Sequence, residues 1–321
     1  MKSFIKKLML ILSVTISFIS IGALLNKINA NNISYENGNV IMIDVARRDM
    51  NEQQIKDIIN NINPNKFQYL QLHLNDNSNF AIKTNILNNE EANNALSINQ
   101  LLQIVKYAND KGITIVPDID LPSHSKALVN YIKRDGLLDN NCIMDNNTLD
   151  YTNEETIRFI EHLYREILPA FDNQQNKYFM IGIDETPGDK TNANDLDNYI
   201  GQLNNYLNIF GFNTIIWNDS LNNNSLSDLP KNIIVDYWKN TGLSINDIKN
   251  HGNLIKNVNY QDNYFNISDL NNRQLEDEKI KKFVNQKGSK MLCLWSNDSG
   301  DKQISNQQII DYIKEVQNNM N

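Results

Sequence analysis

Eight short apolar runs recur along the chain, and helix-like segments separate them. The runs are Asn39–Asp44, Tyr69–Leu74, Ile113–Ile119, Tyr178–Ile183, Asn213–Trp217, Ile233–Tyr237, Leu254–Asn259 and Lys290–Leu294. Short apolar runs bounded by polar or turn-forming residues are typical of buried strands. Amphipathic helical segments are predicted at Asn51–Ile62, Ile98–Asp110, Thr156–Phe171, Asp195–Phe210, Leu275–Gln286 and Asn306–Asn318, with a short helix after the sixth run.

This alternation predicts an α/β fold, a (β/α)8 TIM barrel in a single domain over residues 31–321. An open, doubly wound sheet is the alternative. It is less favoured because no glycine-rich nucleotide-binding turn follows any of the eight runs. No linker-like segment rich in proline, glycine or serine divides the chain.

The first 30 residues read as a secretory signal peptide. Basic residues near the start precede an apolar run, Leu8–Leu25, and Ile28–Ala30 resembles a cleavage site. We therefore expect the protein to be secreted. The alternative is an uncleaved anchor at the cell surface, because the apolar run is long enough to span a bilayer. No later run is apolar enough to do so, and no further membrane contact is expected.

Charge and cysteine content narrow the possible partners. Residues 1–30 carry four lysines and no acid, so the rest of the chain has a net charge of −12 against −8 for the whole. This charge argues against nucleic-acid binding and suits a neutral or cationic partner. Cys142 and Cys293 are too few for a disulfide framework. Cys293 is expected to be a buried thiol, and whether it pairs with Cys142 is left open.

Polar and aromatic residues gather where the apolar runs end. The fourth run, in KYFMIGIDETPG, ends in Asp184 and Glu185. A lone Asp-Glu pair is more often a solvated strand end. Similar residues follow the other runs, however: Asp44, Arg47, His73, Asp76, Asp118, Asp120, His124, Trp217, Asn218, Asp219, Trp238, Tyr260, Tyr264 and Trp295. In a (β/α)8 barrel the ends of all strands meet at the face that holds the active site.

Aromatic rings, carboxylates and one arginine together describe a sugar-binding site. Sugar rings stack on aromatic faces, and their hydroxyls need charged or amide partners. Glycoside cleavage needs an acid for the leaving oxygen and a second group that stabilises the cation-like transition state. Neighbouring acids on one strand end point in different directions and cannot easily flank both faces of a sugar. They suit a reaction in which the 2-acetamido oxygen of the substrate is the nucleophile.

The chain resembles the family 20 glycoside hydrolases, the β-N-acetylhexosaminidases. Within that family it is most similar to the dispersins, which cut poly-β-1,6-N-acetylglucosamine in biofilms. The resemblance rests on segments found in the expected order: DVARR (Asp44–Arg48), LQLHLNDNSNFAI (Leu70–Ile82), VPDIDLPSH (Val116–His124), IGIDE (Ile181–Glu185), WND (Trp217–Asp219), DYW (Asp236–Trp238), NYQDNYF (Asn259–Phe265) and LCLW (Leu292–Trp295).

The resemblance implies a catalytic role for five residues. Glu185 is the general acid and then the base. Asp184 orients the acetamido group, and Tyr264 donates its hydroxyl to the acetamido oxygen. His124 and Asp76 form a relay behind Glu185.

It also implies residues that bind substrate. The sugar is walled by the three tryptophans, its O3 and O4 hydroxyls are held by Arg47, and Asp120 supports the relay. The implied substrate-binding set is Arg47, Trp217, Asp219, Trp238, Trp295, Asn297 and Asp120. His73 has the weaker case and is interpreted as buried scaffold.

The sequence departs from the family pattern at several of these positions. Met180 and Ile183 replace a histidine and a glycine before the acid pair, and Asp118 replaces a glutamate. Asn297 stands where dispersins have a glutamate that holds sugar hydroxyls, a loss for which Asp298 is a candidate replacement. Gly188 stands where dispersins have a tyrosine. These changes leave the linkage and chain-length preference open.

The leading hypothesis is an exported, monomeric β-N-acetylglucosaminidase that acts on poly-β-1,6-N-acetylglucosamine. The acidic surface would favour partly deacetylated, cationic polymer. The alternatives are a hexosaminidase for chitin- or glycan-derived oligosaccharides and a non-catalytic sugar-binding barrel. A metal-dependent deacetylase is disfavoured because His73, His124, His162 and His251 lack the spacing of metal ligands. No metal or cofactor is expected.

Overall fold

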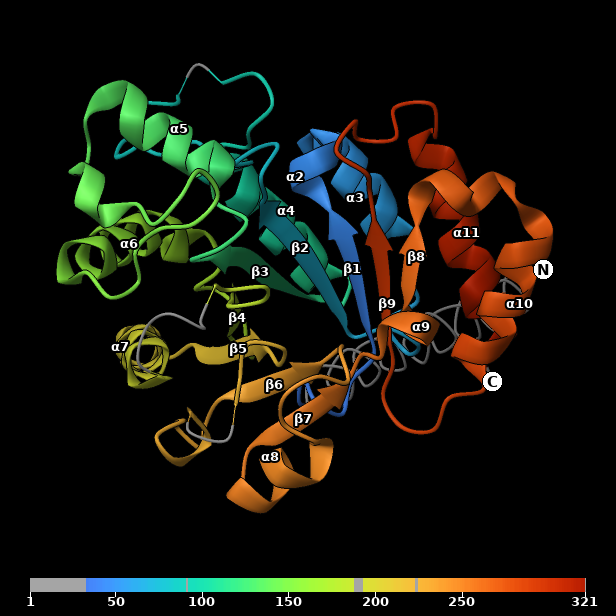
Figure 1. Ribbon diagram of the computed structural model, residues 1–321. Coiled ribbons are helices and arrows are strands. Elements are labelled where there is room, and N and C mark those ends of the chain that lie inside the picture. The colour runs from blue at the N-terminus through green and yellow to red at the C-terminus, as the bar shows by residue number, and fades with distance from the viewer. Residues whose placement is uncertain (1–32, 91, 188–192, 223–224, 321) are drawn as a thin grey trace, which may run out of the picture.

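A curled sheet of nine parallel strands forms the centre of the fold (Figure 1). The structure, a computed structural model, describes residues 33–90, 92–187, 193–222 and 225–320. The strands are β1 (Val40–Asp44), β2 (Tyr69–Asn75), β3 (Thr114–Leu121), β4 (Tyr178–Gly182), β5 (Asn213–Trp217), β6 (Ile234–Tyr237), β7 (Leu254–Asn257), β8 (Tyr264–Asn266) and β9 (Met291–Trp295). Their order, β7-β6-β5-β4-β3-β2-β1-β9-β8, confirms the predicted TIM-barrel fold class.

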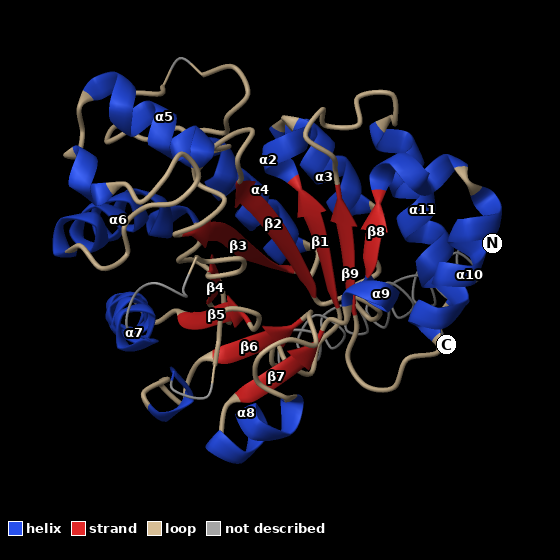
Figure 2. Cartoon of the chain, in the orientation of Figure 1, coloured by secondary structure: helices blue, strands red, loops and turns tan. Residues whose placement is uncertain are grey.

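Helices lie around the sheet, with the longer ones on its outer face (Figure 2). They are α2 (Val45–Arg48), α3 (Glu52–Asn60), α4 (Ile98–Asp110), α5 (Lys126–Asp135), α6 (Glu154–Ile167), α7 (Ala193–Ile209), α8 (Ile245–His251), α9 (Tyr260–Asn263), α10 (Arg273–Val284) and α11 (Asn306–Asn319). Several begin at capping boxes, in which the first and fourth residues exchange hydrogen bonds. Ser97 and Gln100 do so at the start of α4.

The third strand–helix unit differs from the prediction. β3 runs to Leu121, two residues beyond the predicted run, and α5 was not predicted. The predicted helix Thr156–Phe171 stops being α-helical at Ile167, and residues Leu168–Ala170 form a 3-10 turn. Pro169 lies in this turn and has no N–H to continue the α-helical hydrogen bonds.

The structure has a ninth strand that was not predicted. β7 occupies most of the predicted seventh run and pairs with β6, whereas β8 lies beyond that run and pairs with β9, so these two strands form opposite edges of the sheet. The single turn of α9 lies between them in sequence. Its start is fixed by the Asn259 side chain, which accepts from the N–H of Gln261 at 3.0 Å. β8 places Tyr264 beside the last strand, close to Trp295.

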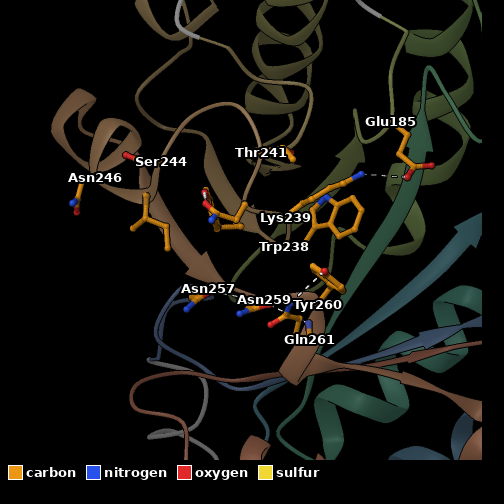
Figure 3. Close-up of a pocket in the computed structure, with 13 residues that line it drawn as sticks. Glu185, Trp238, Lys239, Thr241, Ser244, Asn246, Asn257, Asn259, Tyr260 and Gln261 are labelled. Carbon is orange, nitrogen blue, oxygen red and sulfur yellow. Dashed lines mark hydrogen bonds and ion pairs between the residues drawn. The ribbon is translucent and has the colours of Figure 1, made fainter.

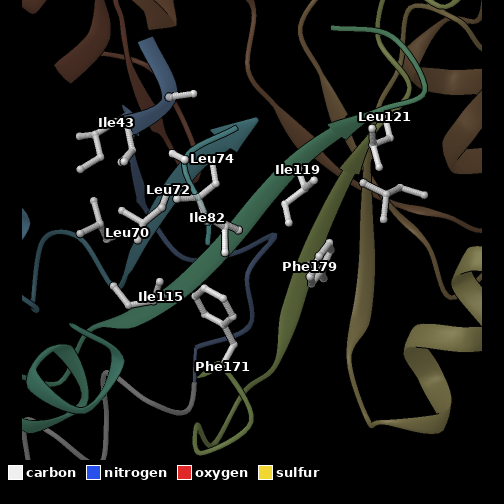
Figure 4. Close-up of a cluster of buried hydrophobic side chains, with 14 of the residues drawn as sticks. Ile43, Leu70, Leu72, Leu74, Ile82, Ile115, Ile119, Leu121, Phe171 and Phe179 are labelled. Atoms are coloured by element: carbon white, nitrogen blue, oxygen red, sulfur yellow. The ribbon is translucent and has the colours of Figure 1, made fainter. Parts of the chain in front are cut away.

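Alternation along the strands divides the core in two. Ile43, Leu70 and Ile115 point outward into a cluster between the sheet and the helices (Figure 4). Val40, Met42 and Val116 belong to a second cluster inside the barrel, against which Trp238, Tyr264 and Trp295 pack. Because side chains alternate with a period of two, Asp44, Asp118 and Asp120 share the parity of these inner residues. The polar residues therefore sit above an apolar plug within the barrel.

Two predictions concern other parts of the chain. The predicted signal segment, 1–30, lies outside the described residues. Among the residues that are described, no helix has the length and apolar character needed to cross a bilayer. Cys142 and Cys293 are both free and buried, as expected for Cys293.

Candidate active site

The turn after β4 sends its two acids in different directions. The Asp184 side chain is 15% exposed, whereas that of Glu185 is 54% exposed. Gly182, Ile183 and Glu185 all have positive φ angles, of 82°, 72° and 49°. A β-branched residue such as Ile183 rarely adopts this conformation. The hydroxyl of Ser123 donates to the Asp184 carbonyl, and the N–H of Glu185 donates to Asp219 Oδ2 at 3.0 Å.

A cavity of about 280 Å³ opens above the barrel at this turn. Side chains from several strand ends line it: Arg47, Asp76, Asp120, His124, Asp184, Glu185, Trp238, Tyr264, Asn266, Trp295, Ser296 and Asp298. The structure thus brings together most of the residues predicted from strand ends. Residues separated by more than 240 positions in sequence meet here because the first and last strands are neighbours in the sheet.

Three aromatic rings form one wall of this cavity. Trp238 and Tyr264 stack with ring centroids 5.7 Å apart and planes 6° from parallel. Trp295 lies 5.7 Å from Tyr264, and its buried indole N–H has no partner among the described residues. Burial raises the pKa of Tyr264, so its hydroxyl keeps its proton and can donate to a ligand.

Arg47 lies beside the aromatic wall and is held by carboxylates. Its guanidinium contacts Asp44 Oδ2 at 2.8 Å and Asp76 Oδ2 at 2.7 Å, and its centre lies 5.5 Å from the Trp295 ring. Asp298 approaches Arg47 Nε at 3.6 Å from the solvent side. Two buried acids fix the arginine, so it can bind sugar hydroxyls without rearranging.

His124 connects the acid pair to Asp76. Its Nε2 lies 3.3 Å from Asp184 Oδ2 and 3.8 Å from Glu185 Oε2, and its Nδ1 lies 3.7 Å from Asp76 Oδ2. The histidine is thus closer to Asp184 than to Glu185, behind which we predicted it. Burial alone would lower the pKa of His124, but Asp184 and then Asp76 outweigh burial and raise it to about 9.

The family of the chain follows from its sequence match. The family model described as the catalytic domain of glycosyl hydrolase family 20 matches residues 39–316. The chain belongs to glycosyl hydrolase family 20. It is therefore placed among the glycoside hydrolases, and the match covers every described strand and most of α11.

Two individual relatives each share less than 30% sequence identity with this family 20 chain. It is 26% identical over 177 residues to a lacto-N-biosidase of Bifidobacterium bifidum, covering 49% of this chain and 16% of the relative. It is 29% identical over 236 residues to β-hexosaminidase subunit A2 of Dictyostelium discoideum, covering 65% and 41%. The chain thus spans less than half of the length of either relative.

Solved structures share the fold. Dispersin B matches with a TM-score of 0.76 at 23% identity, over 88% of this chain and 98% of that one. A module of the pneumococcal exo-β-D-N-acetylglucosaminidase StrH matches with a TM-score of 0.73 at 18% identity, over 88% and 83%. At these identities the likeness shows the fold alone.

Beneath the cavity of this family 20 chain lies a buried histidine that we interpreted as scaffold. His73 Nε2 is 3.1 Å from Asp76, and its Nδ1 is 3.3 Å from Asp118 and 3.5 Å from Asp120. Burial alone would lower the pKa of the His73 imidazole. The neighbouring carboxylates favour its charged form more strongly and raise the pKa. His73 also packs edge-on against Trp295, with centroids 4.9 Å apart. It therefore fixes both Asp76 and the aromatic wall.

Atoms that could ligate a metal ion surround the buried His73. His73, Asp118 and Asp120 each offer an atom within 4.8 Å of the others. These atoms contact one another at hydrogen-bond or ion-pair distances, with His73 between the two acids. Burial, together with Asp118 and Asp184, raises the pKa of Asp120. The group is thus explained as a hydrogen-bonded cluster that supports the site.

Three predicted substrate-binding residues do not line the cavity. Trp217 is fully buried in the barrel, where its N–H donates to Asp120 at 3.3 Å. Asp219 accepts from the Trp238 indole N–H at 2.9 Å and so positions that ring. Asn297 also lies outside the cavity lining. Its side-chain amide donates to Asp301 and accepts from Ser299 within the same loop. Asp298 lines the cavity instead.

The sequence interpretation missed Lys239. Its ammonium lies 3.8 Å from Glu185 Oε1 and 4.8 Å above the Trp238 ring. The residue directly follows Trp238 at the end of β6, so the strand-end rule that selected Trp238 could also have selected it.

The pairing of His124 predicts how stability depends on pH. The folded-state pKa of about 9 exceeds the ordinary value of 6.5, so the charged ring stabilises the fold fully below pH 6.5. This stabilisation, at most about 3 kcal/mol, is lost as the pH rises through 9. Urea unfolding at about pH 6 and about pH 9.5 measures it. Asp184→Asn should flatten the pH dependence, and an unchanged slope in that variant would contradict the pairing.

Proposed function

We propose that the chain is an exported β-N-acetylhexosaminidase that hydrolyses β-linked N-acetylglucosamine with the help of the substrate's own acetamido group. One observation carries the proposal. Asp184 Oδ2 is paired with His124, whereas Asp184 Oδ1 is buried and has no hydrogen-bond partner among the described residues. A buried unsatisfied carboxylate oxygen is costly unless a ligand fills it. The N–H of a 2-acetamido group is a donor of the required kind.

The first chemical step follows from the different exposure of the two acids. The acetamido oxygen attacks the anomeric carbon and forms an oxazolinium ring, while the bond to the leaving oxygen breaks. Glu185, at the rim of the cavity, gives its proton to that oxygen. Asp184, at the base, accepts the acetamido N–H and stabilises the positive charge that develops on the ring. Tyr264 donates to the acetamido group from the aromatic wall.

The second step returns the site to its starting state. Glu185, now ionised, takes a proton from water, and the resulting hydroxide attacks the anomeric carbon. The ring opens and the acetamide is restored, so the configuration of the sugar is retained. His124, whose positive charge is favoured by Asp184 and Asp76, stays paired with Asp184 Oδ2 at 3.3 Å and holds that carboxylate in place in both steps. Arg47 and Asp298 hold the outer hydroxyls of the same sugar.

The proposed polymer is poly-β-1,6-N-acetylglucosamine. The dispersin-like sequence segments and the predicted signal support this substrate and a site of action outside the cell. Digestion of defined β-1,6 and β-1,4 N-acetylglucosamine oligomers, with the products sized, tests it. We expect faster cleavage of the β-1,6 series. Preference for the β-1,4 series would instead favour chitin-derived oligosaccharides, and cleavage of neither would refute the proposal.

A thiazoline that mimics the cyclised acetamide should inhibit the enzyme. Its sulfur-containing ring, once protonated on nitrogen, resembles the oxazolinium intermediate, and the Asp184 oxygen that accepts the acetamido N–H would accept from the ring N–H. We expect competitive inhibition at least about 100-fold tighter than binding of N-acetylglucosamine itself. The measurement is a dose–response curve on 4-nitrophenyl N-acetylglucosaminide. Equal affinity for the two compounds would argue against an acetamido nucleophile.

A further inference from the structure

A second, larger cavity adjoins the first. It has a volume of about 1030 Å³ and shares Glu185 and Trp238 with the smaller cavity. Its other walls come from the segment between β6 and α8 and from the segment around α9: Tyr237, Lys239, Asn240, Thr241, Ser244, Ile245, Asn246, Asn257, Asn259, Tyr260 and Gln261. Figure 3 shows Lys239 extending past Trp238 towards Glu185, with Asn257, Asn259, Tyr260 and Gln261 on the other side.

The position of this cavity identifies what it can hold, given the proposed function on which this inference rests. The smaller cavity holds the sugar whose bond breaks. Glu185 protonates the leaving oxygen, so the leaving sugar must lie on the far side of Glu185 from that first sugar. The larger cavity meets the smaller one at Glu185 and Trp238, so it is the adjoining space that can take the leaving sugar. Tyr260, 45% exposed and in edge contact with Trp238, offers an aromatic face for a sugar ring there.

The lining of this cavity is rich in amides and poor in charge. Asn240, Asn246, Asn257, Asn259 and Gln261 all contribute to it. Amide side chains both donate and accept, which matches the N–H and C=O of an acetamido group. Among the described lining residues, Glu185 and Lys239 are the charged ones. A general acid carries its proton when it acts, so Lys239 is then the remaining charge.

Lys239 is held in place from two sides. Its backbone N–H donates to the buried Asn218 side chain at 3.2 Å, and its carbonyl accepts from the Asn218 amide at 2.7 Å. Its ammonium lies 4.8 Å from the centre of the Trp238 ring and 3.8 Å from Glu185 Oε1. The backbone bonds to Asn218 and the contact with the Trp238 ring keep the positive charge near the acid whether or not Glu185 carries its proton.

We propose that this cavity binds the leaving sugar and that Lys239 makes it select an N-acetylated unit over one with a free, charged amine. An ammonium group on the leaving sugar would share this cavity with the ammonium of Lys239, and like charges inside one part-solvated cavity repel. An acetamido group is neutral and finds amide partners. The net negative charge of the chain attracts cationic polymer from a distance, whereas Lys239 determines which bonds are cut.

The test compares two disaccharides. Both have the linkage that is cleaved faster in the oligomer digestion. Both carry N-acetylglucosamine at the non-reducing end, and the second unit is either N-acetylglucosamine or glucosamine. We expect kcat/KM to be on the order of tenfold higher for the fully acetylated substrate. Lys239→Met keeps the length of the side chain without its charge and should bring the ratio to within about threefold. Lys239→Glu should favour the glucosamine substrate.

Lys249→Met is the matched control, because Lys249 is exposed on α8 and does not line the cavity. It should keep the wild-type ratio. Hydrolysis of 4-nitrophenyl N-acetylglucosaminide reports whether each variant is folded and active. A wild-type ratio near one, or an unchanged ratio in both Lys239 variants, would overturn the selection by Lys239 while leaving the hexosaminidase activity in place. Failure of the wild type on all three substrates would overturn the proposed function as well.

Discussion

Replacing Glu185 by glutamine should lower kcat on a disaccharide of N-acetylglucosamine by about 10³-fold, within the range that a general acid–base residue contributes. The amide has nearly the shape of the acid but no proton of suitable acidity to give to the leaving oxygen. Binding of N-acetylglucosamine should change little, because the buried contacts of the first sugar come from Asp184, Arg47 and the aromatic wall.

The size of this loss should depend on the leaving group. A 4-nitrophenolate leaves readily without a proton, so its glycoside should lose less rate in the first step than the disaccharide does. Comparing the two substrates therefore separates loss of the acid from general damage to the site. Glu278→Gln, an exposed change on α10, is the control and should retain full activity. If Glu185→Gln cleaved the disaccharide as fast as the parent, our assignment of the acid would be wrong.

Gly182→Ala should both destabilise the fold and misplace the acids. A Cβ atom at this position would lie 2.6 Å from Asp120 Cα and 2.9 Å from Leu121 N, and φ is +82°. Both obstacles are backbone atoms of β3, so a side-chain rotation cannot relieve the clash. The left-handed backbone and the overpacking together should cost about 3 kcal/mol. Separation of β3 from β4 would also move Asp184 away from His124, for a further loss of about 100-fold in kcat/KM.

Urea unfolding and kinetics of the folded protein measure these two effects. Gly201→Ala is the control, because Gly201 lies within α7 and an added Cβ would meet no atom within 4 Å. This change should leave activity intact and stabilise the helix by up to about 1 kcal/mol. If Gly182→Ala unfolded at the same urea concentration as the parent, close approach of β3 and β4 would not be what the glycine provides.

The family pattern has a second glycine where this chain has Ile183. The structure gives Ile183 a φ of 72° and buries it completely. The backbone conformation that a glycine would serve is thus kept, although a β-branched side chain occupies it at a cost of about 1–3 kcal/mol. The apolar contacts of the buried side chain offset this strain. Ile183 belongs to the cluster between the sheet and the helices and does not line the cavity.

Strand parity made much of the site predictable from sequence. In β3, Val116, Asp118 and Asp120 are two residues apart, so a single inward-facing residue fixes the direction of the others. The same rule places Cys293 and Trp295 of β9 inside the barrel. Once eight strand–helix units were recognised, the strand ends had to meet at one face. The strand ends selected the acid pair, the aromatic residues and Arg47 as candidates, and the resemblance to family 20 supplied their roles.

Pairings between distant segments were not predictable in this way. The sequence placed His124 behind Glu185, but the positive φ of His124 (53°) and the turn at Ile183 bring it closer to Asp184. The sequence chose Asn297, whereas loop hydrogen bonds to Asp301 turn that amide away and leave Asp298 facing the cavity. These outcomes depend on loop conformations and rotamers that a pattern of residue types does not encode.

The sequence by itself determined which side of each strand faces inward and which residues lie at the strand ends, because alternation and chain order are local properties. Only the tertiary structure decided that an additional strand, β8, pairs with β9, that one oxygen of Asp184 has no partner among the described residues, and that Lys239 stands beside Glu185. Those features arise where segments far apart in the chain come within a few ångströms of each other. At that range, strand register and side-chain rotamers decide which groups touch.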